Sequence, residues 1–167
     1  MSVLAAAVGA ILAAILESSV LTHLSVGGSK LDLVFAVGVA VAMVLGFEAG
    51  MTWAFAGGVM LDVLMPERTL GATALALVAV TAIALVVARA VWPPRMVAVV
   101  VSVCVLAVVF QLLLLGLLMV TAGVTMAGHS IADLLLVAVL DAALAIPAVV
   151  IARALDLRFG DPERVAW

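Results

Sequence analysis

Charged side chains are scarce in this chain: Asp, Glu, Lys and Arg make up only 10% of its 167 residues, and tyrosine is absent. A soluble domain typically contains about 25% charged residues, which cover its surface. Hydrophobic residues instead reach 69%, and the mean hydropathy is +1.51. Only a lipid bilayer accepts an outer surface that is as apolar as the interior. The composition therefore predicts an integral membrane protein and excludes a soluble domain.

The few polar residues also exclude several classes of function. The net charge is only −3 and no basic run occurs, which argues against a nucleic-acid partner. A single cysteine, Cys104, excludes an internal disulfide and a cysteine metal cluster. His23 and His129 have no further ligand at matched helical spacing. No catalytic triad or phosphate loop is recognisable, so we expect a non-enzyme without catalytic residues, metal or cofactor.

Apolar runs separated by Gly, Pro and charge predict an all-α bundle of six transmembrane helices, since one crossing needs about 20 residues. The runs are Val3 to Leu21, Leu31 to Gly46, Gly50 to Leu64, Leu70 to Ala90, Met96 to Val120 and Ile131 to Ala152. The second and third runs are short, so two tilted or partly re-entrant pieces are the alternative. Residues 1–155 would form the bundle, and residues 156–167 a short cytoplasmic tail.

Six crossings place both termini on the same side of the membrane. That side then collects Arg89, Arg95, Arg153, Arg158 and Arg164. The opposite side collects only Lys30 and Arg68. Because cytoplasmic loops carry the excess of Lys and Arg, this distribution predicts that both termini are cytoplasmic.

Asp141 is the charged residue that lies deepest in the predicted membrane region. An Asp at mid-helix costs about 2.5–3.5 kcal/mol on insertion scales, which the Leu, Val and Ile residues around it outweigh. We expect no second acid at the same depth. This favours a protonated, hydrogen-bonded packing residue, or a contact with a partner helix, over a proton or cation relay. A proton channel through Asp141 is the most distant alternative.

The other acids in or near the runs map to the non-cytoplasmic face. They are Glu17, Asp32, Asp62, Glu67 and Asp133. The simplest ion pairs join Glu17 to Lys30 and Asp62 to Arg68. Asp32 and Asp133 precede or open their runs, so we expect them to stabilise helix N-termini through the helix dipole.

Small residues recur at four-residue spacing in two places, which in lipid lets helix backbones approach closely. One stripe comprises Ala6, Ala10 and Ala14, and the other comprises Gly46, Gly50, Ala54 and Gly58. The glycine-bearing stripe is the stronger indication of helix association, because alanine is so common in this chain.

Three short motifs carry a resemblance to a known family. Lys30-Leu31-Asp32 leads the second run, Gly50, Gly58 and Asp62 follow at multiples of four in the third, and Leu70-Gly71 opens the fourth. This stretch resembles the rod shape-determining protein MreD family, whose members have a Pro-Asp-like start to the second helix, a G-x-x-x-G-x-x-x-D pattern and a Leu-Gly pair. Here Lys30-Leu31-Asp32 stands in place of Pro-Asp.

The resemblance implies a multi-pass scaffold of the bacterial cell-elongation complex in the plasma (inner) membrane. Its implied partners are MreC, the glycosyltransferase RodA with its penicillin-binding transpeptidase, and the actin-like MreB. The implied fold is similar to the substrate-binding subunits of energy-coupling-factor transporters. The candidate partner or helix-packing residues are Asp32, Gly50, Gly58, Asp62, Arg68, Gly71 and Asp141.

A second hypothesis is a vitamin-type transporter subunit or small carrier. The stripe of Ala6, Ala10 and Ala14 resembles the coupling surface of such subunits. Against it, the predicted outer loops are short and poor in aromatic and hydrogen-bonding groups that would hold a polar vitamin.

Overall fold

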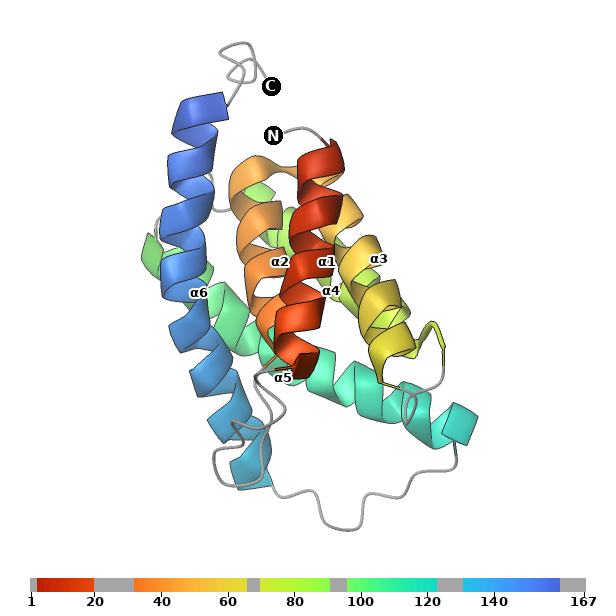
Figure 1. Ribbon diagram of the computed structural model, residues 1–167. Helices are drawn as coiled ribbons and strands as arrows, with labels where there is room; N and C mark the ends of the chain where they lie inside the picture. The colour runs from red at the N-terminus through yellow and green to blue at the C-terminus, as the bar shows by residue number, and fades with distance from the viewer. Residues whose placement is uncertain (1–2, 20–31, 66–69, 91–95, 123–130, 160–167) are drawn as a thin grey trace.

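The computed structural model describes residues 3–19, 32–65, 70–90, 96–122 and 131–159, which form six α-helices (Figure 1). The helices are α1 (Val3–Ser19), α2 (Leu33–Leu45), α3 (Phe47–Leu64), α4 (Ala72–Ala90), α5 (Met96–Ala122) and α6 (Ile131–Phe159). Each coincides with one predicted apolar run, which confirms the all-helical class. The largest boundary differences are in α3, which begins at Phe47 rather than Gly50, and in α6, which continues past Ala152 to Phe159.

Three of the described helices contain a segment long and apolar enough to cross a bilayer. These segments are Ala72–Ala90, Val97–Val120 and Leu136–Ala154. Val3–Ser19 and Leu33–Leu45 are apolar but shorter. At about 1.5 Å per residue, α2 is about 20 Å long, less than the hydrocarbon core of about 30 Å. The membrane character is supported, and six complete crossings stay a prediction.

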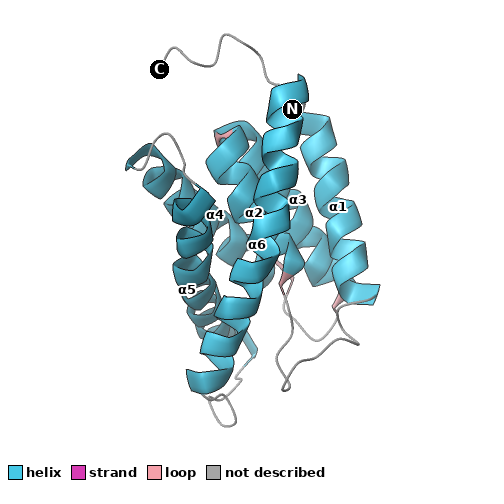
Figure 2. Ribbon diagram, turned by 90° about the vertical axis from the view of Figure 1, so that its left-hand side faces the viewer, coloured by secondary structure: helices cyan, strands magenta, loops and turns pink. Residues whose placement is uncertain are grey.

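The short helix α2 occupies the centre of the bundle and contacts each of the other five described helices. Figure 2 shows it between the α1–α3 pair and the α4–α5 pair, with α6 closing one side. Most of its residues are buried, from Val34 near its start to Leu45 at its end. Because protein surrounds α2, its polar start at Asp32 lies inside the bundle, where Asp32 is itself buried.

Successive helices run in alternating directions along the bundle (Figure 1). The start of α1 and the end of α6 therefore lie at the same end of the bundle. Gly46 alone connects α2 to α3. Its φ of 90° lies in the left-handed region that glycine tolerates without strain. This tight turn makes α2 and α3 an antiparallel helical hairpin.

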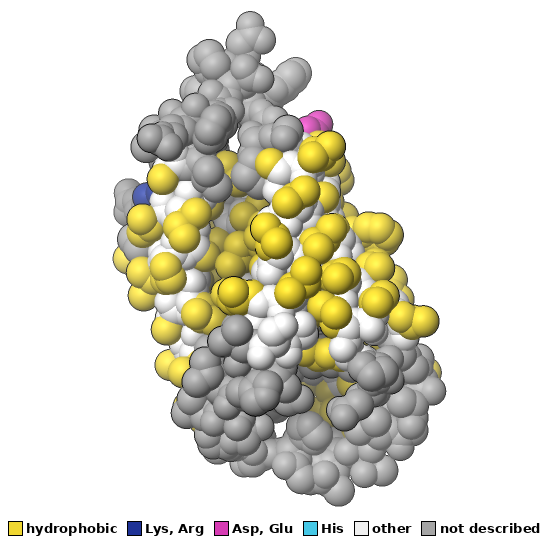
Figure 3. All heavy atoms as spheres, in the orientation of Figure 1, with side chains coloured by type: hydrophobic (Ala, Val, Ile, Leu, Met, Phe, Trp, Pro, Cys, Tyr) yellow, Lys and Arg dark blue, Asp and Glu magenta, His cyan; other side chains and the backbone are white. Residues whose placement is uncertain are grey.

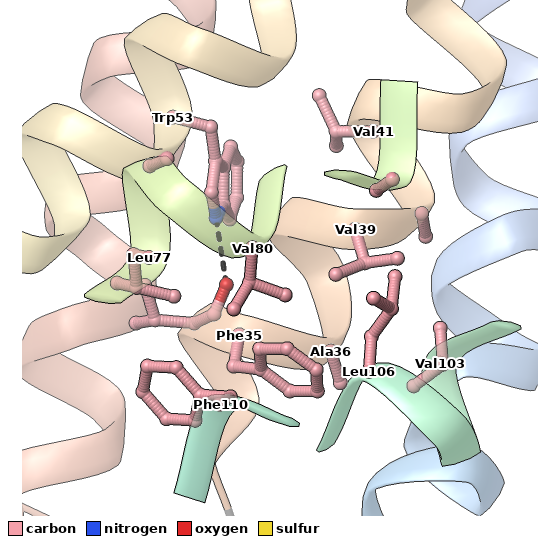
Figure 4. Close-up of a cluster of buried hydrophobic side chains, with 14 of the residues drawn as sticks. Phe35, Ala36, Val39, Val41, Trp53, Leu77, Val80, Val103, Leu106 and Phe110 are labelled. Atoms are coloured by element: carbon pink, nitrogen blue, oxygen red, sulfur yellow. Dashed lines mark hydrogen bonds between the residues drawn. The ribbon is translucent and has the colours of Figure 1, made fainter. Parts of the chain in front are cut away.

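Aromatic side chains anchor the centre of the core (Figure 4). Phe35 of α2 stacks on Phe110 of α5, with ring centroids 4.9 Å apart and planes inclined by 15°. On the other side of α2, the indole Nε1 of Trp53 donates a hydrogen bond to the Val34 carbonyl oxygen at 3.0 Å. The buried indole nitrogen is thereby satisfied, and α3 is joined to α2.

The outer surface of the helices is apolar over most of their length (Figure 3). On the face shown, charged side chains of the described residues appear only toward the upper end. Exposed large hydrophobic residues occur on every helix except α2, for example Leu12, Phe55, Val86, Val105 and Val139. In a water-soluble monomer such a surface would be unusual, whereas in lipid it is the expected solvent-facing side.

Candidate functional site: a glycine and aspartate packing motif and a buried acidic cluster

The glycines of the third run bring α3 against two neighbouring helices. A Cβ atom on Gly50 would lie 2.7 Å from the Cα atom of Ala42 in α2. A Cβ atom on Gly58 would overlap the Cα atom of Ala74 in α4 and lie 2.9 Å from its backbone nitrogen. Normal carbon contacts are about 3.5–4.0 Å. Only glycine therefore permits both backbones to approach this closely, as close packing in lipid requires.

Asp62, one turn after Gly58 on α3, holds the start of α4. Its Oδ2 atom accepts hydrogen bonds from the backbone N–H groups of Gly71 at 2.9 Å and Ala74 at 3.2 Å. Its Oδ1 atom accepts one from the N–H of Thr73 at 3.2 Å. The first N–H groups of a helix have no partner within the helix and carry partial positive charge. A buried carboxylate from α3 therefore acts as the N-terminal cap of α4.

Gly71 provides the chain reversal that this cap needs. Its φ of 93° is in the left-handed region, and its N–H points to Asp62 directly ahead of α4. The predicted partner of Asp62, Arg68, lies outside the described residues. The contacts of Asp62 that the structure describes are with backbone N–H groups, so its charge is already compensated by the start of α4.

A second polar group surrounds the start of α2 and joins four helices. We call Glu17, Asp32, Gln111 and Asp141 the acidic cluster. The Oε2 atom of Glu17 in α1 accepts a hydrogen bond from the Val34 N–H at 2.7 Å. The Oδ1 atom of Asp141 in α6 accepts one from the Asp32 N–H at 3.0 Å.

Gln111 of α5 completes the acidic cluster. Its Nε2 atom donates a hydrogen bond to Oδ2 of Asp32 at 2.5 Å. Sequence reasoning missed Gln111, although a lone amide inside the long apolar run Met96 to Val120 was a usable signal. An amide at such a position costs free energy unless it is hydrogen-bonded, so it indicates a polar partner on another helix.

The structure corrects two predictions about these acids. The expectation that no second acid shares the depth of Asp141 is wrong, because the Asp32 N–H donates a hydrogen bond to Oδ1 of Asp141. The reason is the short α2, whose start lies well inside the bundle. Asp32 occupies the N-cap position of α2 as expected, but its side chain makes no capping hydrogen bond there. The carboxylate of Glu17 does so instead.

The Oδ2 atom of Asp141 differs from the other carboxylate oxygens described above. Asp141 is 0% exposed, and its Oδ2 atom has no hydrogen-bond partner among the described residues. A buried polar atom without a partner is rare and calls for an explanation.

The alanine stripe of α1 faces inward. Ala6, Ala10 and Ala14 are all 0% exposed. A Cβ atom on Gly57 of α3 would lie 3.5 Å from the Cβ atom of Ala10, which places the stripe against α3. This stripe is thus a contact within the chain, and the idea that it is a coupling surface for another subunit is wrong.

Several remaining candidates lie outside the part of the chain that the structure describes. Lys30, Glu67, His23 and His129 lie outside the described residues, as does the side chain of Asp133. Within the part of the chain that the structure describes, no group of three or more His, Cys, Asp or Glu residues is arranged to hold a metal ion.

The two sites together connect every helix of the bundle. The motif of Gly50, Gly58, Asp62 and Gly71 joins α3 to α2 and α4, and the acidic cluster joins α1, α2, α5 and α6. No protein-family model matches the chain, and no curated protein or solved structure shows significant similarity to it.

Proposed function

We propose that this chain is a non-enzymatic membrane scaffold of the bacterial cell-elongation complex, which directs peptidoglycan synthesis and so controls rod shape. Its proposed partners are MreC, RodA with its penicillin-binding transpeptidase, and MreB. In this proposal the chain crosses the inner membrane six times, with both termini in the cytoplasm. The proposal starts from the resemblance of residues 31–75 to the MreD family.

The observation that carries the proposal is the role of the resembling residues in the structure. Gly50, Gly58, Asp62 and Gly71 are separated in the sequence, yet they form one continuous packing unit across α2, α3 and α4. Gly50 and Gly58 lie at close contacts between helices, and Asp62 accepts a hydrogen bond from the Gly71 N–H at the start of α4. The motif therefore has a physical reason to exist as a unit, which supports the family assignment.

The distribution of polar groups supports a binding role over transport. The buried carboxylates of Asp62, Glu17 and Asp32 each accept a hydrogen bond from another helix or from the start of one. These hydrogen bonds thus join the helices of the bundle. The surface left for partners is the apolar outer face of the helices, where van der Waals packing and interhelical hydrogen bonds drive association in lipid.

Gly58 and Asp62 face α4, so a partner helix does not need to touch them. In the proposed complex the partner packs against outward-facing side chains of one or two helices. The structure offers one strongly exposed position on each outer helix for a test. These positions are Leu12, Phe55, Val86, Val105 and Val139.

Site-specific photo-crosslinking from these five positions, in cells of the native host, tests the proposal. We expect crosslinks to MreC or to RodA from positions on one side of the bundle and from none on the opposite side. A crosslinker at the buried position Val39 is the matched control and should capture neither protein. Crosslinks to lipid alone from all five positions would refute the scaffold assignment.

A further inference from the structure

The unpartnered oxygen of Asp141 identifies a second kind of site, independent of the elongation-complex proposal. Asp141 lies in the third turn of α6, within the apolar segment Leu136–Ala154. It is completely buried. Oδ1 accepts the N–H of Asp32, while Oδ2 has no hydrogen-bond partner among the described residues. Among the described residues, the side chain therefore has one hydrogen-bonded oxygen and one buried oxygen without a donor.

Among the described residues, the charged groups that act on Asp141 are acids. The groups that act on it electrostatically are the carboxylates of Asp32, at the start of α2, and Glu17, on α1. From α5, the group that faces the cluster is the neutral amide of Gln111. Lys30 and His23 lie outside the described residues. The N-terminus of α2 supplies a partial charge of about +0.5, and three carboxyl groups lie around it.

The N-terminus of α2 cannot compensate the negative charge of all three carboxylates. Glu17 already accepts the N–H of Val34, and Asp32 is bonded to Gln111. Asp141 accepts one hydrogen bond from an N–H group. A carboxylate in water, by comparison, accepts hydrogen bonds from several donors on both oxygens. A buried carboxylate with an open oxygen beside two other acids is the least favourable of the three charges.

Three kinds of ligand could compensate Oδ2. A metal ion is disfavoured, because the described acids are not grouped closely enough to hold one. A side chain from another protein cannot reach an atom that is fully covered by this chain. A proton needs no additional space and removes the charge.

We propose that Asp141 is a proton-binding site, with the proton on Oδ2, and that this bound proton holds α6 against the start of α2. In the protonated state, Oδ1 still accepts the Asp32 N–H and the cluster contains one negative charge fewer. Loss of the proton puts a third anion at the junction of α1, α2 and α6. The resulting repulsion separates α6 from α2, so the packing of α6 weakens as pH rises.

Infrared spectroscopy of the full chain tests the site directly, in dodecyl maltoside, which has no carbonyl group. A neutral carboxylic acid shows a C=O stretching band that a carboxylate lacks. We expect this band at neutral pH in the wild type, its loss in Asp141→Asn, and its retention in Asp62→Asn, because Asp62 accepts three N–H bonds. Persistence of the band in Asp141→Asn, or its absence from the wild type, overturns the proposal.

Isotope labelling separates aspartate from glutamate without any variant. The band should shift when aspartate carries a ¹³C carboxyl group, and it should stay in place when only glutamate is labelled. A shift with labelled glutamate would instead place the proton on a residue such as Glu17 and overturn the proposal.

The proton-dependent packing of α6 against α2 is tested by the pH dependence of thermal unfolding. Because the folded state holds the proton, the Tm of the wild type should fall from neutral to alkaline pH. Asp141→Asn is neutral at every pH and nearly the same shape, so its Tm should fall less over the same range. Equal pH dependence of the two proteins would overturn this role of the proton.

Discussion

Gly58→Ala adds a single methyl group, and it tests the close packing of α3 on α4 separately from the intrinsic stability of the helix. The added Cβ would overlap the Ala74 Cα atom and lie 2.9 Å from its nitrogen, both of which are backbone atoms of α4. Neither can move aside as a flexible side chain would, so α3 must shift away from α4. Overpacking of this kind costs about 1–3 kcal/mol.

The same shift stretches the contacts of Asp62, one turn away. Two of its three hydrogen bonds are already 3.2 Å long, so a small displacement breaks one of them. A hydrogen bond to a charged group contributes about 1.5–3 kcal/mol. Alanine recovers about 0.5–1 kcal/mol over glycine in a helix interior. We therefore expect Gly58→Ala to lower the free energy of unfolding by about 2–4 kcal/mol.

Gly116→Ala on α5 is the matched control. Gly116 also lies within a helix, but a Cβ there would meet nothing within 4 Å. This variant should be as stable as the wild type or up to about 1 kcal/mol more stable. Unfolding of both variants by SDS titration in mixed micelles gives the comparison. Equal stability of the two would refute the packing role assigned to Gly58.

Three further variants probe the polar contacts. Asp62→Asn replaces one acceptor oxygen by a donor that faces N–H groups, and should lower the free energy of unfolding by about 2 kcal/mol. Glu48→Gln, at an exposed position, is the control and should change this free energy little in the same titration. Trp53→Phe loses the indole bond to α2 and should cost about 1 kcal/mol; an unchanged midpoint would show that the bond is not needed. Gln111→Leu leaves the buried Asp32 carboxylate without its amide donor and should cost about 1–3 kcal/mol. A more stable Gln111→Leu protein would contradict that role.

The composition was enough to predict the helices of this fold. In lipid every backbone polar group must be paired within the chain, so long apolar runs bounded by Gly, Pro and charge become helices. The start of α5 at Met96 and the end of α3 at Leu64 were predicted correctly. The end of α6 was not, because its last residues are polar and a helix can extend beyond the apolar run that the composition detects.

The depth of the acids could not be predicted from hydropathy. A hydropathy pattern assumes that each run crosses the whole bilayer and places acids at run ends near the surface. Asp32 violates that assumption, since α2 is short and enclosed by other helices. Its start therefore lies beside Asp141 in the interior. Contacts between residues so distant in sequence depend on tertiary packing.

The packing partners of the small residues could not be predicted from the sequence either. The four-residue spacing correctly indicated that Gly50 and Gly58 lie at helix contacts. It did not indicate that one faces α2 and the other faces α4. The stripe of Ala6, Ala10 and Ala14 has the same spacing, and it packs inside the chain. Spacing identifies a surface for close approach, and the tertiary structure determines which helix uses it.

The central claim, that the chain is a scaffold for cell elongation, is tested most directly by depleting the protein from its native host and following cell width. The proposal predicts that rod-shaped cells widen and become round, and that a wild-type copy restores the rods. Cells that keep their width and their rate of peptidoglycan insertion after complete depletion would contradict it.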